Sequence, residues 1–378
     1  MKAKRAVGKY HQIGNLRYFI PHSLPPVNPA LEMNAEIISL YGEASFALGQ
    51  LNEMSEKLLS PKRFIKAYVI KEALLSSAIE GVHTTLLDVF THVLNDKQRP
   101  NKNTQLVLNY THALETAFVM ISKEKFPLVS RVILHTHQAL MSVGEGDKAT
   151  PGEFRKQSVR VGELIPPPAP EIPNLMQDFE KYINQSHDLP PLIQAGLAHV
   201  HFETIHPFLD GNGRIGRMLI VLMLVHSGLL KLPILYPSYY FKKHHLKYYQ
   251  KLDRVRTHGD FEGWMSYYLQ AIKESAIDAH RRAKEIENLE NKLRNKIQTD
   301  KAFSKMRETA QEVIEALFDQ PITGASEMSK RVNRSYNTVQ NIFKIFCRHH
   351  FLSKGDLRKR HQMYRFDPYM KLLEKEYS

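Results

Sequence analysis

The sequence predicts an all-α protein, because apolar residues recur at helical spacing along most of its 378 residues. Only two short stretches, around Gly162 and after Phe351, alternate apolar and polar residues as β-strands do. The hydrophobic share of 43% and the charged share of 24% are ordinary for a globular chain, and exclude disorder or a coiled-coil rod for most of it. At roughly 100–200 residues per domain, this length predicts two or three domains.

Charge and cysteine content indicate the protein's surroundings. The 52 Lys and Arg residues against 39 Asp and Glu residues give a net charge of +13, which attracts polyanions such as nucleic acid or nucleotides. The one cysteine, Cys347, cannot build a disulfide framework, and no apolar signal segment follows the basic N-terminus. The longest apolar stretch, Met218 to Leu230, is too short and interrupted to span a bilayer. We therefore expect a cytoplasmic protein with no membrane partner.

Changes in composition divide the chain into five predicted regions. These are a proline-rich N-terminal strap (1–35), an N-terminal helical region (36–110), the main helical core (111–276), a polar and strongly charged helical linker exposed to solvent (277–301) and a C-terminal domain (302–378). The helical patterns of the first part are Glu32–Leu51, Phe64–Ile79, Thr84–Val93, Asn103–Lys123, Leu128–Met141, Leu175–Asn184, Pro190–Ile205, Asn212–Ser227, Lys243–Thr257 and Phe261–Ile272.

The C-terminal domain resembles a winged helix-turn-helix. Its three helical patterns, Glu308–Phe318, Ala325–Val332 and Ser335–Cys347, precede a short predicted hairpin, and its net charge is 14 − 9 = +5. One interpretation is a DNA-binding domain in which Ser335–Cys347 is the recognition helix. The side chains expected at the start of that helix are Arg334, Asn337 and Gln340. The other is a module for protein docking or dimerisation, and the basic charge slightly favours nucleic acid.

The stretch from His206 to Arg217 combines the residue types that phosphate chemistry needs. Gly211 and Gly213 flank Asn212 directly before an apolar helix, and glycines there allow unusual dihedral angles and close approach of a ligand. The free N–H groups of a helix N-terminus and its dipole then form an anion site.

Charged groups surround this anion site. Arg214 and Arg217 share one face of the first helical turn and can donate to phosphate oxygens, while a carboxylate such as Asp210 beside phosphates is a typical Mg²⁺ ligand. His206 can act as a general base near neutral pH. The combination predicts nucleotidyl or phosphoryl transfer from a metal nucleotide. A plain glycine-rich turn between two helices explains each residue singly but not all of them together.

The same stretch resembles the motif of the Fic family, HxFx(D/E)GNGRxxR, at every defined position. The resemblance covers about residues 35–275 and implies a Fic helical core. It further implies an enzyme that transfers AMP from ATP to a Ser, Thr or Tyr hydroxyl of a target protein and releases pyrophosphate, with self-modification as a further outcome. A homodimer is also expected.

The resemblance implies a role for each motif residue. His206 would deprotonate the target hydroxyl, Asp210 would hold Mg²⁺, and Arg217 would bind the γ-phosphate. His244 stands where many relatives have an Asn. The residues implied in nucleotide binding are Glu80, His206, Gly211, Asn212, Gly213, Arg214, Ile215, Gly216, Arg217 and His244.

Two further segments resemble parts of Fic proteins. The alternating segment Val159–Ile165 resembles the flap that aligns the target chain by strand addition, although a plain surface hairpin explains it equally well. Ser76, Glu80 and Gly81 match the inhibitory signature (S/T)xxxE(G/N). The implied role is that Glu80 pairs with Arg217 and occupies the space of the γ-phosphate.

Two alternative interpretations concern metal binding and sensing. His199, His201 and Glu203 could suggest a metal cluster, but the two histidines lie on different helical faces, so we expect them, like His135 and His137, to be core or pocket residues. In the other alternative, the helical core only senses a nucleotide and the chain is a DNA-binding regulator. A sensor does not need a general base such as His206, which favours the enzyme.

Overall fold

α-Helices make up most of the structure, as the helical spacing of apolar residues predicts. The computed structural model describes residues 6–57, 61–94, 100–142, 149–185, 188–355 and 362–375. The helices are α1 (Ala35–Lys57), α2 (Pro61–Ile79), α3 (Leu86–Leu94), α4 (Lys102–Ser122), α5 (Ser130–Met141), α6 (Ile172–Asn184), α7 (Pro191–Ile205), α8 (Asn212–His226), α9 (Ser238–Lys243), α10 (His245–His258), α11 (Phe261–Thr299), α12 (Arg307–Asp319), α13 (Ala325–Arg331), α14 (Tyr336–Arg348) and α15 (Asp367–Glu374).

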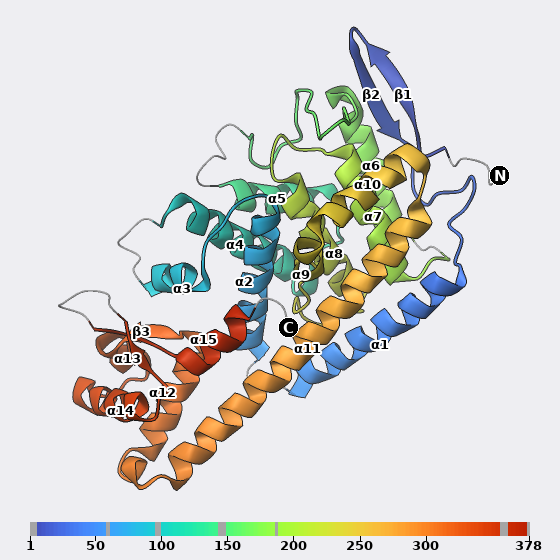
Figure 1. The fold of residues 1–378 in the computed structure, drawn as a ribbon. Helices are drawn as coiled ribbons and strands as arrows, with labels where there is room; N and C mark the ends of the chain where they lie inside the picture. Colours follow the sequence, from blue (N-terminus) through green and yellow to red (C-terminus); the bar gives the residue numbers. More distant parts are fainter. Residues whose placement is uncertain are drawn as a thin grey trace.

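Helices α7 and α8 form the centre of the core. Almost every residue of both is buried, and α2, α5, α6, α10 and α11 lie around them (Figure 1). A helix that is apolar on all sides is expected in such a position, because it has no face left for solvent. This burial explains why the apolar stretch that begins at Met218 belongs to a core helix. None of the helices in the described ranges is long and apolar enough to cross a membrane.

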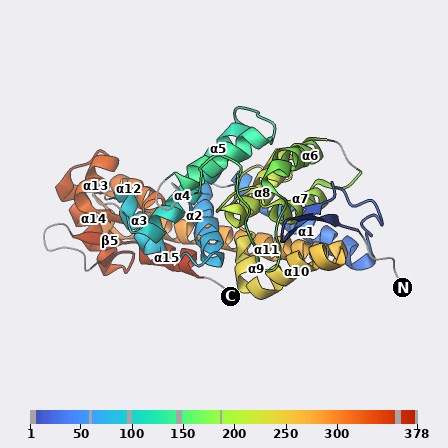
Figure 2. The same ribbon diagram turned by 90° about the horizontal axis from the view of Figure 1, so that it is seen from above.

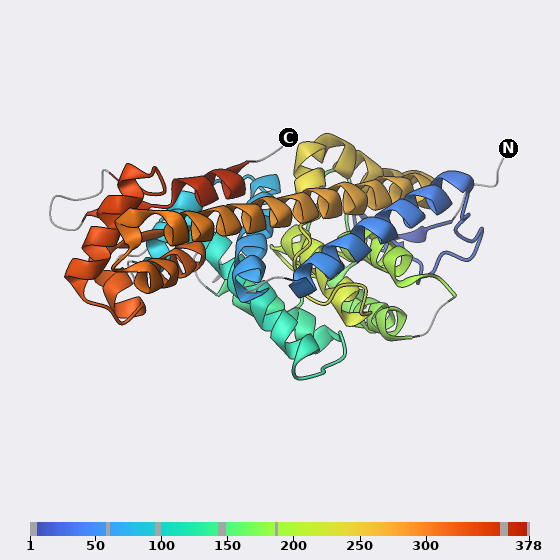
Figure 3. The same cartoon turned by 90° about the horizontal axis from the view of Figure 1, so that it is seen from below.

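The predicted solvent-exposed linker is instead part of the long helix α11. This helix of 39 residues runs unbroken from the core to the C-terminal elements, with α1 packed along its first part (Figure 3). One face of residues 277–299 is buried, so the prediction of a solvated helix is wrong for that face. Apart from the buried ion pair of Asp278 and Arg282, the buried positions follow one another at alternating steps of four and three: Ala279, Ala283, Ile286, Glu290, Leu293 and Ile297. The many charges between them concealed this apolar stripe.

The predicted strap begins with a β-hairpin that its proline content had obscured. Strands β1 (Gly8–Ile13) and β2 (Leu16–Pro21) pair antiparallel around a two-residue turn, in which Gly14 has a φ of 57°. Tyr18, Phe19 and Ile20 are buried, so the hairpin packs on the core, and its tip projects beyond it (Figure 1).

The C-terminal region has the order of elements expected for a winged helix. After α12 come β3 (Ile322–Gly324), α13, α14, β4 (Ser353–Lys354) and β5 (Met363–Arg365), and the strands form an antiparallel sheet in the order β3-β5-β4. Most of the charged turn predicted between the last two strands lies outside the described residues. The sequence did not predict the short helices α9 and α15.

The C-terminal region packs on the helices α2 and α3 and not only on α11. Helix α3 lies beside the C-terminal elements (Figure 2), and the side chain of Gln320 donates a hydrogen bond to the carbonyl of Phe90 at 3.2 Å. Lys66 of α2 donates to the carbonyl of Asp319 at 3.4 Å, and Arg282 donates to the carbonyl of Leu372 at 2.8 Å. These contacts place the C-terminal region against the helix whose end carries Glu80.

Candidate active site

A tight loop joins α7 to α8 and carries the predicted motif. His206 ends α7 with a φ of 51°, Gly211 has a φ of 80°, and α8 begins at Asn212. The amide of Asn212 donates to the carbonyl of Phe208 and accepts from its N–H, both at 2.8 Å. The side chain of Asn212 therefore closes the loop, and its contribution to an anion site would come from its backbone N–H at the helix start.

The side chain of His206 is neutral at physiological pH. Burial, together with the nearby charge of Arg155, lowers its pKa to about 4. The Arg155 guanidinium donates to the carbonyl of His206 at 2.8 Å, and the N–H of Arg155 donates to the carbonyl of Pro207 at 2.8 Å. A neutral imidazole with a fixed backbone has the protonation state that a general base requires.

His137 supports the loop from α5, as expected for a pocket histidine. Its ring stacks on Phe208 with the ring centroids 3.7 Å apart. One ring nitrogen lies 3.1 Å from the carbonyl oxygen of Asp210, and the other accepts a hydrogen bond from the N–H of Gly152 at 3.0 Å. These contacts hold the loop between α7 and α8 against α5.

The guanidinium groups of the two motif arginines form hydrogen bonds with different partners. Arg214 donates to the carboxylate of Asp210 at 3.1 Å, whereas Arg217 donates to the carboxylate of Glu80 at 2.7 Å and to the hydroxyl of Ser76 at 2.8 Å. Both guanidinium groups are buried. Arg214 is thus paired with the loop before α8, whereas Arg217 is paired with residues at the end of α2.

The carboxylate of Glu80 lies at the N-terminus of α8. A side chain at Gly213 would collide with this carboxylate and would come within 2.9 Å of the Arg217 guanidinium, so the ion pair requires a glycine there. Glu80 follows the last residue of α2, and Gly81, with a φ of 78°, turns the chain away. The ion pair that the sequence predicted is present, and its negative end faces the predicted anion site.

Two buried carboxyl groups near the motif were not predicted as part of the site. Burial raises the pKa of both Glu72 and Glu203 to about 7. Glu72 accepts hydrogen bonds from the hydroxyl of Ser238 at 2.5 Å and from that of Tyr110 at 3.1 Å. A signal for Glu72 exists in the sequence, because it lies four and eight residues before Ser76 and Glu80 on one face of α2.

The histidines of α7 are buried in the core. Within the described ranges, no three His, Cys, Asp or Glu side chains are grouped to hold a metal ion. His199 bonds the carbonyl of Gly216 at 2.9 Å and the hydroxyl of Tyr248 at 2.8 Å through its two ring nitrogens, as a core histidine does. His244 lies between α9 and α10, where its ring centroid is 4.3 Å from that of Tyr240.

The predicted flap contains a tight turn and not a full hairpin. Val161 and Leu164 exchange two backbone hydrogen bonds of 2.9 and 3.0 Å across Gly162, whose φ is 57°. The carbonyl of Ile165 instead accepts from the N–H of Phe19 in β2 at 2.9 Å. Three prolines follow at 166–168 and cannot donate to a ladder, which limits the pairing to one bridge.

The fold and the site define an all-α domain in which a tight loop leads into the N-terminus of a buried helix, the kind of position where proteins bind anions. Residues 127–224 match the family model of the Fic/DOC family, and residues 38–119 match that of the Fic/DOC family N-terminal region. Both segments therefore resemble the Fic/DOC family, one its main domain and the other its N-terminal region.

Curated relatives show the same resemblance. The chain is 36% and 35% identical over 146 residues to proteins named Protein adenylyltransferase Fic from Drosophila erecta and Drosophila melanogaster. The matched part is 38% of this chain but only 28% of the length of those relatives.

Two solved structures share the fold. A Fic family protein from Desulfovibrio desulfuricans G20 aligns with a TM-score of 0.57 and 23% identity over 89% of this chain and 97% of that one. Fic-1 from C. elegans aligns with a TM-score of 0.53 and 19% identity over 68% of this chain and 74% of that one. The first of these alignments extends beyond the ranges that the family models match.

Proposed function

We propose that this protein is an autoinhibited adenylyltransferase that transfers AMP from ATP to a Ser, Thr or Tyr hydroxyl of a target protein. One observation carries the proposal: a neutral histidine, a glycine-bounded loop and the carboxylate-paired Arg217 surround the N-terminus of α8. The names of the relatives that match this region support the same reaction.

The reaction needs a base beside an anchored triphosphate. His206 takes the proton of the target hydroxyl, whose oxygen attacks the α-phosphorus of ATP. A new P–O bond forms, the bond from the α-phosphorus to the oxygen bridging to the β-phosphate breaks, and pyrophosphate leaves with the electron pair. The N–H groups at the start of α8 bind phosphate oxygens, and Arg217 binds the γ-phosphate once Glu80 releases it. The flap at 159–165 would align the target chain.

Asp210 is the residue that would hold Mg²⁺. Its side chain is 54% exposed beside the loop, and its carboxylate already contacts Arg214. Mg²⁺ is typically bound by one or two carboxylates together with substrate phosphates, so a single acidic ligand at the edge of a phosphate site suits this metal. When bound, Mg²⁺ would neutralise negative charge on the phosphates.

Inhibition follows from the place of the Glu80 carboxylate. It occupies the N-terminus of α8 and one face of the Arg217 guanidinium, which are the groups that a γ-phosphate would use. Two anions cannot share this position beside the buried Arg217 guanidinium, because they repel each other at such short range. ATP would therefore bind without its γ-phosphate in the productive place.

Four proteins test the proposal: the wild type, Glu80→Gly, Arg217→Ala and the double variant. We expect Glu80→Gly to transfer labelled AMP at least about tenfold faster, as a loss of ~1.4 kcal/mol of opposition gives. Arg217→Ala and the double variant should be inactive, because freeing an absent arginine gains nothing.

Glu124→Gly, a change of an exposed carboxylate just after the end of α4, is the matched control and should behave as the wild type. Mass spectrometry of a lysate treated with ATP and Glu80→Gly would identify the modified hydroxyls. A Glu80→Gly protein no faster than the wild type would contradict the inhibitory role.

The C-terminal region supports a second function, binding of duplex DNA. Asn337, Asn341, Lys344 and Arg348 are exposed at helical spacing on α14, and α14 has no Asp or Glu. Two of the predicted DNA contacts have partners within the region instead. Arg334 donates to both carboxylate oxygens of Glu312 at 2.7 and 2.8 Å, and Gln340 donates to the hydroxyl of Tyr364 at 3.2 Å. The exposed polar face of α14 is thus the surface that would enter a groove.

A further inference from the structure

His199 of α7 is a buried histidine whose single ring proton can be placed from its contacts. Burial lowers its pKa to about 3, so the imidazole is neutral and carries one N–H. Its Nδ1 atom lies 2.9 Å from the carbonyl oxygen of Gly216. Because a carbonyl oxygen can only accept a hydrogen bond, Nδ1 carries the proton and Nε2 is left as an acceptor.

This tautomer of His199 fixes the direction of the Tyr248 hydroxyl. Nε2 of His199 lies 2.8 Å from the hydroxyl oxygen, and since Nε2 has no proton, Tyr248 is the donor. The lone pairs of the hydroxyl oxygen then remain for another donor. Burial raises the pKa of Tyr248 well above its usual value, whereas the charge of Arg217 and a hydrogen bond with it lower that pKa. Since a guanidinium can only donate, Arg217 donates to Tyr248.

A chain of hydrogen bonds therefore leads from the side chain of Arg217 back to the backbone of α8. The guanidinium donates to Tyr248, Tyr248 donates to His199, and His199 donates to the carbonyl of Gly216. Gly216 directly precedes Arg217, so the chain begins and ends at neighbouring residues of one helix. Such a closed chain holds the Arg217 side chain relative to its own backbone.

Tyr248 is itself held in place by aromatic packing. Its side chain is buried, and its ring centroid lies 4.7 Å from that of Phe241 and 6.2 Å from that of Trp264. A side chain in a densely packed interior has few alternative rotamers. The acceptor that Tyr248 offers to Arg217 is therefore fixed by the core and not by α2.

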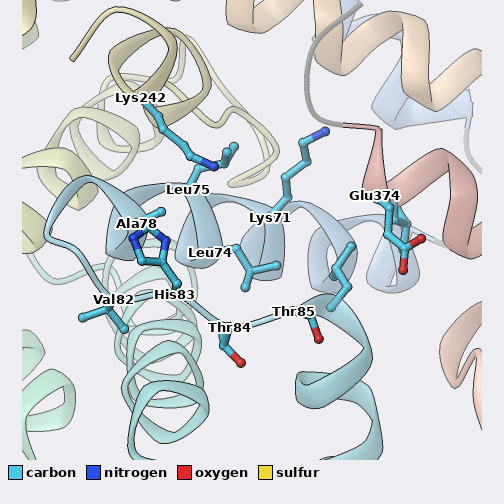
Figure 4. A pocket seen from close by; sticks show the side chains of 12 residues that line it. Lys71, Leu74, Leu75, Ala78, Val82, His83, Thr84, Thr85, Lys242 and Glu374 are labelled. Carbon is cyan, nitrogen blue, oxygen red and sulfur yellow. The ribbon is translucent and has the colours of Figure 1, made fainter. Parts of the chain in front are cut away.

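The other contacts of Arg217 come from α2, which has room to move. Ser76 and Glu80 accept from its Nε and Nη2 atoms at 2.8 and 2.7 Å, so Nη1 remains available to Tyr248. A cavity of about 290 Å³ between α2, α9 and α15 is lined in part by apolar side chains of α2 (Figure 4). A helix beside unfilled space has fewer contacts to lose when it shifts. The contacts with α2 can therefore be released while the contact with Tyr248 stays.

We propose that Tyr248 is a positioning residue for Arg217, and that it keeps the guanidinium in the place where it binds the γ-phosphate after Glu80 has released it. The inference rests on the proposed adenylyltransferase function, in which Arg217 binds this phosphate. A guanidinium that is already oriented loses less conformational freedom when it binds an anion, and therefore binds it more tightly. Without the Tyr248 hydroxyl, the released guanidinium would adopt several orientations.

Calorimetry with the α,β-methylene analogues of ATP and ADP tests the inference. The two analogues differ only in the γ-phosphate, and neither can transfer AMP because the bond that would break is replaced. We expect Glu80→Gly to bind the ATP analogue at least about tenfold more tightly than the ADP analogue. Adding Tyr248→Phe should weaken binding of the ATP analogue about tenfold and leave that of the ADP analogue unchanged. A purely structural role would weaken both equally.

Tyr268→Phe, also made in Glu80→Gly, is the matched control. The hydroxyl of Tyr268 is buried and has no hydrogen-bond partner among the described residues, and its ring packs on the same Trp264 with the centroids 6.1 Å apart. The variant thus removes a buried hydroxyl from the same aromatic cluster without touching Arg217. It should keep the affinity for both analogues.

The outcomes separate this inference from the proposed function. If Glu80→Gly binds both analogues equally, Arg217 does not bind the γ-phosphate, and the proposed role of Arg217 is wrong together with this inference. If Glu80→Gly prefers the ATP analogue and Tyr248→Phe keeps the full preference, the role of Arg217 stands and that of Tyr248 is wrong. Equal weakening of both analogues by Tyr248→Phe would also contradict positioning, because the loss would not depend on the γ-phosphate.

Discussion

The backbone and the side chain of His206 are fixed by different neighbours. The left-handed φ of 51° is uncommon for a residue other than glycine, and Arg155 holds the carbonyl in place. Burial keeps the imidazole neutral. We expect His206→Ala, made in the Glu80→Gly protein, to lose AMP transfer by a factor on the order of 10²–10⁴. ATP binding, measured by calorimetry, should persist, because the base contacts the target hydroxyl and not the phosphates.

His206→Asn is the control for backbone strain in that experiment, because asparagine adopts the left-handed conformation readily and cannot act as a base. It should be as inactive as His206→Ala and at least as stable. Transfer by either variant at a rate near that of Glu80→Gly would exclude His206 as the base.

Glu203 makes the stability of the protein depend on pH. Burial raises its pKa from 4.5 to about 7, so the folded state holds the proton more strongly than the unfolded state. The stabilisation is complete below pH 4.5 and is lost as the pH rises through 7. We expect the unfolding free energy of the wild type to fall by up to about 3 kcal/mol more than that of Glu203→Gln when the pH is raised from 5 to 8. Urea unfolding at both pH values measures this difference.

Glu124→Gln is the control for Glu203→Gln, since Glu124 is exposed just after the end of α4. It should follow the wild type at both pH values. If the stability of Glu203→Gln and of the wild type changes equally with pH, the pKa of Glu203 does not differ between the folded and the unfolded state.

At the scale of elements, the flap is held to the active-site loop by one buried side chain. Arg155 is 2% exposed and donates to the carbonyls of Gln157, Pro167 and His206 at 2.9, 2.6 and 2.8 Å. It thus joins both ends of the flap to the end of α7. We expect Arg155→Ala to slow AMP transfer to a protein target at least about tenfold more than it weakens ATP binding. The reason is that the flap would no longer be positioned over His206.

Arg160→Ala, in the same segment but exposed, is the matched control for Arg155. Arg155→Ala also leaves three carbonyls without their donor, at about 1–3 kcal/mol each where they stay buried, so assays should use a temperature at which the variant is folded. An unchanged ratio of transfer rate to ATP affinity would mean that Arg155 only stabilises the fold.

The sequence predicted the elements that have a strong local pattern. The helical spacing of apolar residues located ten of the eleven helices from α1 to α11, missing only α9, and the motif located His206, Asp210 and Arg217. The N-terminal hairpin and the buried stripe of α11 were missed, because prolines and charges concealed them. Arg155 and Glu203 could not be predicted as site residues, since their importance comes from segments that the fold brings together. The hydrogen bond between Ile165 and Phe19 of β2 could not be predicted for the same reason.

At the scale of the molecule, the net charge of +13 attracts polyanions. The C-terminal region, which packs on α2 and α3, connects such a ligand to these helices. A ligand of the C-terminal region would therefore bind next to α2, the helix whose end carries Glu80. Helix α11 further joins that region to the core as one continuous helix. The exposed polar face of α14 is therefore the surface on which to test for a polyanion.

We expect the full chain to bind random duplex DNA weakly, with an affinity that falls steeply as salt increases. Lys344 and Arg348 are exposed on α14 and would contact phosphates. Replacing both by glutamine should therefore reduce the slope of log affinity against log salt by about 2. The matched control replaces the exposed Lys284 and Lys292 of α11, which removes the same charge from another helix and should leave the slope unchanged.

If both double variants lose affinity equally, the attraction comes from the overall charge and α14 is not a DNA-binding helix. If the wild type does not bind at low salt, the proposal of DNA binding by the C-terminal region is wrong.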